Sequence, residues 1–90
     1  MATPKFALGK VVITAHAKDV LHPEDVTVCL ARHASGDWGD LDEYDLRENE
    51  LPLAQGARLF SVYHDRCRTK FYIITEHDRS VTTILLPDDY

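Results

Sequence analysis

The sequence has no long apolar run and no pattern of a secretory signal. Its apolar stretches, such as residues 72–74 and 84–86, are far shorter than the ~20 residues that a transmembrane helix requires. The residues that follow Met1 do not form the apolar region of a signal peptide. We therefore expect a cytoplasmic protein that does not associate with membranes.

Cysteine, glycine and proline are also scarce. The chain has two cysteines, four glycines and four prolines, and the glycines and prolines are too scattered to form a linker. Two cysteines in a reducing compartment are typical of free thiols rather than of a disulfide framework. With 90 residues, the chain is predicted to be one small domain over residues 1–90.

The familiar motifs of cofactor and metal chemistry are missing. There is no phosphate-binding loop, no dinucleotide glycine fingerprint, no CxxC pair and no HExxH. The five histidines and the carboxylates have no metal-ligand spacing. We therefore expect no metal and no cofactor, and the sequence leaves open whether the protein is an enzyme.

The chain is acidic, with a formal net charge of −5. Proteins that bind a phosphate backbone usually need a basic face, so this charge favours a protein partner over nucleic acid. Arg66, Arg68 and Lys70 form a local basic group that could contact nucleic acid, or could be solvated residues that protect a sheet edge. The oligomeric state is not predicted.

The first half of the chain is predicted to hold a strand and three helices. In residues 6–14, successive side chains would alternate between the two faces of a strand, and many of them are β-branched, which indicates a strand. Thr14 can cap a short helix over 15–21. Pro23 is typical of the first position of a second helix, which Gly36 would end. A third helix would run from about Leu41 to the residues before Pro52.

The second half of the chain predicts three strands, at residues 58–64, 69–76 and 81–86. These segments are β-branched and aromatic, and the loops between them are short, so the strands should be antiparallel neighbours. The expected fold class is α+β, with an antiparallel sheet of three to four strands, a β-α-α-α-β-β-β order and helices packed on one face. The place of the first strand in the sheet is left open.

The end of the second helix and the loop after it hold the first candidates for a site. His33 lies on the apolar stripe of that helix and is close in sequence to Asp37. A carboxylate can orient a histidine as a base or ligand. The alternative is a structural histidine that binds the last helix carbonyls and packs under Trp38, with Asp37 and Asp40 capping turns. The structural interpretation is favoured.

Asp45 and Asn49 share one stripe of the third predicted helix with two leucines. Polar groups within an apolar stripe need hydrogen-bond partners when they are buried. They could form the polar floor of a pocket, or a clamp between this helix and a neighbouring loop or strand end. The sequence does not distinguish the two.

The third group of candidates lies in the hairpin before the last strand. Glu76, Asp78, Arg79 and Ser80 could be one wall of a site, or could be an ordinary charged turn. All three groups together give one candidate site or polar clamp, formed by His33, Asp37, Trp38, Asp45, Asn49, Glu76, Asp78, Arg79 and Ser80.

Three stretches resemble a family of small bacterial proteins labelled plasmid-related, some of which carry an automatic label as a type I restriction modification subunit. The stretches are RHASGDWGDL (32–41), GARLFSVY (56–63) and IITEHDRSVTTILLP (73–87). The candidate residues match the family pattern, whereas His22 and Pro52 depart from it. A methyltransferase activity is not expected, because the chain lacks a glycine-rich cofactor loop and an Asn-Pro-Pro-aromatic motif.

The resemblance implies a bacterial setting on mobile elements and no known activity. Our first hypothesis is a non-enzymatic binding or interaction module that serves such an element. The alternative is a small enzyme or ligand-binding domain whose site joins the loop at 33–40, Asp45 with Asn49, and the hairpin at 76–80. The alternative predicts that these side chains converge on one cleft.

Overall fold

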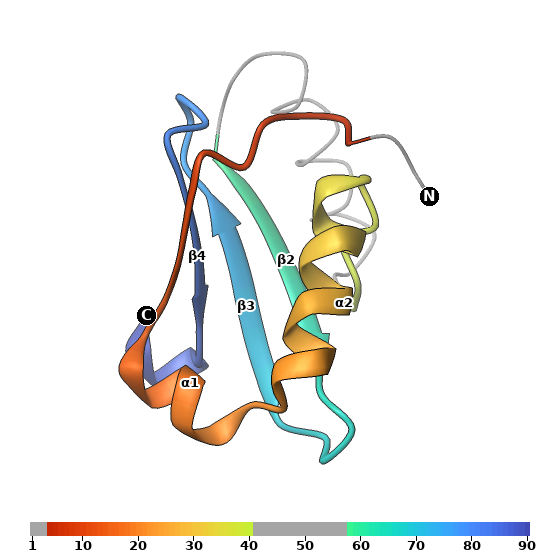
Figure 1. Cartoon of the computed structure of the whole chain (residues 1–90), viewed down its shortest axis with the longest axis vertical. Helices are drawn as coiled ribbons and strands as arrows, with labels where there is room; N and C mark the ends of the chain where they lie inside the picture. Colours follow the sequence, from red (N-terminus) through yellow and green to blue (C-terminus); the bar gives the residue numbers. More distant parts are fainter. Residues whose placement is uncertain (1–3, 41–57) are drawn as a thin grey trace.

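The computed structural model describes residues 4–40 and 58–90 of the chain. The elements in chain order are β1 (Lys10–Ile13), α1 (Ala15–Val20), α2 (Pro23–Ala34), β2 (Leu59–His64), β3 (Lys70–Thr75), β4 (Val81–Leu85) and a short 3-10 helix, η1 (Pro87–Asp89). The strands form one sheet in the order β1-β4-β3-β2 (Figure 1). The predicted α+β class is confirmed, while the third predicted helix falls outside the described residues.

The two described helices begin and end as their residues predict. The Thr14 hydroxyl accepts a hydrogen bond from the Ala17 N–H at 3.1 Å and caps α1. Pro23 starts α2, and Gly36 follows its end with a positive φ of 83°. The Gly36 and Asp37 N–H groups bond to the carbonyls of His33 and Arg32, which is the pairing of a Schellman cap.

The three C-terminal strands are antiparallel neighbours, as predicted. The β2–β3 register runs from Leu59 opposite Thr75 to His64 opposite Lys70, and β3 pairs antiparallel with β4. The Asp65 carboxylate accepts the Cys67 and Thr69 N–H groups at 2.9 and 3.0 Å and so closes the β2–β3 turn.

The first strand is shorter than predicted, and the structure supplies its place in the sheet, which the sequence left open. It begins only at Lys10, because Gly9 has a φ of +64°, outside the extended region. A Cβ at Gly9 would overlap the Ser80 carbonyl oxygen, so a side chain would not fit there. The strand pairs parallel with β4, from Lys10 opposite Val81 to Ile13 opposite Ile84. The sheet is therefore mixed rather than wholly antiparallel.

The core lies between the sheet and the two helices. Ala17 of α1 and Cys29 of α2 belong to one apolar cluster with the strand residues that face them. The strand members of this cluster are Tyr63, Phe71, Ile73 and Ile84. We call the opposite side of the sheet the helix-free face, since no described α-helix covers it. Among residues 4–40 and 58–90, no helix is long and apolar enough to cross a membrane.

Candidate functional site

His33 is at the centre of a buried row of polar side chains. Its ring is fully buried, its Nδ1 lies 2.5 Å from Ser61 Oγ of β2, and its Nε2 lies 2.9 Å from Thr75 Oγ1 of β3. Thr75 Oγ1 lies 2.7 Å from Thr82 Oγ1 of β4, which donates to the Leu8 carbonyl at 2.7 Å. We call this row the His33 clamp, because it links α2 to three strands and to the segment before β1.

The last bond of the His33 clamp fixes the direction of the others. The Leu8 carbonyl can only accept, so the Thr82 hydroxyl donates to it. Thr82 must then accept from Thr75, and Thr75 from His33 Nε2–H. His33 is therefore the neutral Nε2–H tautomer, and its Nδ1 accepts from the Ser61 hydroxyl. Both ring nitrogens are used, so neither is available to a substrate.

Two aromatic rings, those of Phe6 and Trp38, pack against the His33 ring. The centroids of Phe6 and Trp38 lie 5.3 and 5.5 Å from that of His33, both edge-on, and the two rings stack on each other at 5.9 Å. The Arg79 guanidinium lies 5.7 Å from the Phe6 ring centroid. Burial and, to a smaller extent, the Arg79 charge lower the pKa of His33 from 6.5 to about 4. The imidazole is thus uncharged at neutral pH.

The carboxylates of the loop after α2 do not approach His33. Asp37 forms a two-bond ion pair with Arg32, at 2.8 and 3.3 Å, and accepts the Gly39 N–H at 3.2 Å. The hydrogen bond from Arg32 lowers the pKa of Asp37. Asp40 lies 2.7 Å from His64 Nδ1. These contacts are on the surface and hold the loop in place.

The hairpin at 76–80 is stabilised by its own residues. The Asp78 carboxylate accepts the Ser80 N–H at 3.0 Å and the Ser80 hydroxyl at 2.5 Å, and these bonds lower the pKa of Asp78. Arg79 has a φ of +61° and donates to the Glu76 and His77 carbonyls at 3.1 and 3.3 Å. Glu76 itself borders a pocket on the helix-free face.

Of the candidate residues, the structure brings together His33 and Trp38, and it joins Arg79 to them through Phe6. Asp37, Glu76, Asp78 and Ser80 lie apart from this group, on the surface or in their own turn. Asp45 and Asn49 lie outside the described residues. Within residues 4–40 and 58–90, no group of His, Cys, Asp and Glu side chains could hold a metal ion.

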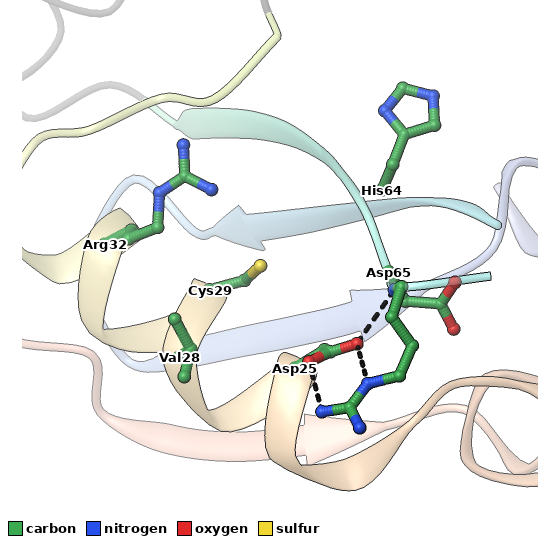
Figure 2. A pocket seen from close by; sticks show the side chains of 7 residues that line it. Asp25, Val28, Cys29, Arg32, His64 and Asp65 are labelled. Carbon is green, nitrogen blue, oxygen red and sulfur yellow. Dashed lines mark hydrogen bonds and ion pairs between the residues drawn. The ribbon is translucent and has the colours of Figure 1, made fainter. Parts of the chain in front are cut away.

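A pocket of about 260 Å³ between α2 and the β2–β3 hairpin has no free charged group (Figure 2). Asp25 accepts three hydrogen bonds from Arg66, at 2.8, 3.0 and 3.0 Å, and these lower the pKa of Asp25 to about 2. Arg32, on the same wall, is paired with Asp37. Burial raises the pKa of the Cys29 thiol, so it is protonated and a poor nucleophile.

Sequence reasoning missed an aromatic cluster on the helix-free face. Phe60 and Tyr72 are neighbours there, with ring centroids 4.8 Å apart, and Tyr90 meets both edge-on at 6.5 and 6.2 Å. Arg58 donates to the Tyr90 hydroxyl at 2.7 Å and lies near its ring. The period-two alternation of β2 and β3 could have shown that Phe60 and Tyr72 lie on the opposite face of the sheet from Ser61 and Ile73.

A second pocket, of about 230 Å³, lies beside this cluster. We call it the Glu76 pocket; its lining residues are Arg58, Ile74, Glu76, Thr83, Leu85, Asp89 and Tyr90. Asp89 accepts from the Thr14 hydroxyl at 2.7 Å and the Leu86 N–H at 3.1 Å, which lowers its pKa. Among the described residues, no hydrogen bond or ion pair engages the Glu76 side chain. The pocket thus combines an apolar floor with a carboxylate that is open to a ligand.

The acidity of the chain is unevenly distributed. Residues 41–57 contain five acidic residues and one arginine, so they carry four of the five net negative charges. The rest of the chain is close to neutral. Comparison with protein-family models, curated proteins and solved structures finds no match.

Proposed function

We propose that this protein is a non-enzymatic binding module that holds a basic side chain of a partner protein in the Glu76 pocket. The observation that carries the proposal is the Glu76 carboxylate, which stands over an apolar floor without a bonding partner among the described residues. A lysine or arginine side chain has the matching chemistry, because its stem is apolar and its head is cationic.

The surroundings of the pocket support a protein partner. Protein interfaces are enriched in tyrosine, phenylalanine and arginine, and Phe60, Tyr72, Tyr90 and Arg58 form such a group beside Glu76. Arg58 donates to the Tyr90 hydroxyl and lies beside the Tyr90 ring, so it has a fixed position at the rim of the cluster. The net charge of −5 favours encounter with a basic partner over a phosphate backbone.

The polar candidate residues support a module without chemistry of its own. In the His33 clamp every hydrogen-bonding atom of the imidazole is occupied by a neighbouring side chain. Asp37 and Asp78 are likewise bonded to their own loops. The link to bacterial mobile elements is part of this proposal, and it is supported by the sequence resemblance alone.

A titration with a small arginine peptide tests the proposal. We expect an acetylated, amidated peptide with one arginine to shift the amide resonances of Ile74, Glu76 and Thr83, with a Kd on the order of 1 mM for so small a ligand. The same peptide with citrulline, which is neutral and similar in shape, should bind at least about tenfold more weakly, since it lacks the charge.

The variant Glu76→Gln should lose this preference for arginine. Asp19→Asn is the matched control, because it removes one charge from an exposed position on α1 and should bind as the wild type does. Equal binding of both peptides, or unchanged binding by Glu76→Gln, would contradict the proposal. The other contrary outcome is that single-stranded RNA shifts the amide resonances of Phe60 and Tyr72 while neither peptide binds. In that case the helix-free face binds nucleic acid and the proposal is wrong.

A further inference from the structure

The outer edge of β1 presents backbone groups that are not used within the described structure. The Lys10 N–H donates to the Ser80 carbonyl and the Thr14 N–H to the Ile84 carbonyl, so these residues face β4. Backbone groups of alternate residues point to opposite edges of a strand. The N–H and C=O groups of Val11 and Ile13 therefore point outward, away from the sheet.

The other edge strand of the sheet, β2, is paired along part of its outer side, whereas β1 is not. On β2, the Val62 N–H donates to the Trp38 carbonyl and the Val62 carbonyl accepts the Asp40 N–H. In Figure 1 the trace of residues 10–13 runs along the margin of the molecule beside β4. Within residues 4–40 and 58–90, nothing pairs with its outer side.

The side chains of this edge are apolar and exposed. Val11 and Ile13 are 43% and 36% exposed, and they lie on the same face of the sheet, opposite Thr82 and Ile84. β-Branched residues are the ones that favour cross-strand packing. An exposed edge of this kind is a template for a further strand.

We infer that β1 pairs antiparallel with β1 of a second copy of this chain, and that the pairing joins two sheets across a two-fold axis at Val12. With Val12 opposite its own copy, Val11 is opposite Ile13 of the second molecule, and Ile13 is opposite its Val11. All four residues have outward backbone groups, so the pairs form four hydrogen bonds, two in each pair. The register that satisfies the backbone thus also packs Val11 against Ile13.

Charges agree with this register. Lys10 of one molecule would lie opposite Thr14 of the other, so the two Lys10 side chains are about 13 Å apart along the strands. A four-residue strand buries much less than the ~1,600 Å² of a standard interface. We therefore expect a weak, concentration-dependent dimer, with a Kd on the order of 100 μM.

Sedimentation velocity over about 10 μM to about 1 mM protein tests the pairing. The wild type should shift from monomer to dimer, and Ile13→Pro should stay a monomer, because proline removes an outward N–H at an edge position that tolerates it. Val11→Lys should also stay a monomer. Val28→Lys is the matched control, since Val28 is 60% exposed on α2, and it should dimerise like the wild type.

Amide hydrogen exchange gives a readout that needs no variant. The Val11 and Ile13 amides should become protected as the protein concentration rises, whereas the Val12 amide, which faces β4, should be protected throughout. A wild type that stays monomeric at the highest concentration would overturn the inference. A dimer that persists in both Ile13→Pro and Val11→Lys would also overturn it. The same holds if the exchange rates of the Val11 and Ile13 amides do not change with protein concentration.

Discussion

His33→Ala should lower the free energy of unfolding by about 3–5 kcal/mol, the largest effect that we expect from any single substitution outside the apolar core. The change removes a fully buried ring and leaves a cavity. It also leaves the Ser61 and Thr75 hydroxyls without their partner in the interior. Since a domain of this size has only about 5–15 kcal/mol of stability, urea unfolding should show a strongly destabilised protein.

His64→Ala is the matched control for this substitution. His64 is an exposed histidine bonded to Asp40 at 2.7 Å, and surface pairs of this kind contribute roughly 0–1 kcal/mol. Should His33→Ala fail to fold, Thr82→Val removes one hydroxyl of the clamp at nearly constant volume and should cost about 1–3 kcal/mol. A His33→Ala protein as stable as His64→Ala would contradict the structural role that we assign to the clamp.

Stability should fall steeply as the pH drops from about 6.5 to about 4. The pKa of His33 is about 4 in the folded protein and about 6.5 in an unfolded chain, so below pH 6.5 the unfolded state binds a proton that the folded state rejects. The stabilisation is complete above pH 6.5 and is lost on acidification. Over the whole interval the loss amounts to about 3 kcal/mol.

Urea unfolding at several pH values between about 7.5 and 4.5 measures this dependence. The lowered pKa values of Asp25, Asp37 and Asp78 act in a different interval, because their stabilisation is lost only below the ordinary carboxylate pKa of about 3.9. His77→Gln, at an exposed position, should keep the wild-type slope. His33→Gln, if it folds, should lose most of this pH dependence of the unfolding free energy. An unchanged slope in that variant would show that other groups cause the pH dependence.

Much of the fold could be predicted because its signals are local. Pro23 and Gly36 bound α2 as expected, and the β-branched and aromatic runs define β2, β3 and β4 to within one residue. Short loops between them dictate antiparallel pairing. The parallel pairing of β1 with β4 has no such signal, because it joins segments some 70 residues apart and depends on the positive φ of Gly9.

The candidate site was harder to predict because it depends on register. The apolar stripe of α2 placed His33 in the interior, but its partners Ser61, Thr75 and Thr82 belong to three strands that align only in the folded sheet. Serine and threonine hydroxyls in a strand are common and carry no signal of their own. Asp37, by contrast, finds its partner five residues away, in Arg32.

The protonation state of His33 tests the central claim most directly, namely that this histidine is a buried structural link rather than a reactive group. Long-range ¹H–¹⁵N correlation spectra of the imidazole nitrogens, recorded on the wild type from neutral pH downward, report both the tautomer and the pKa. We predict the neutral Nε2–H tautomer, with titration only near pH 4. A His33 that titrates near pH 6.5, or that carries its proton on Nδ1, would contradict the directed row of hydrogen bonds from Ser61 to Leu8.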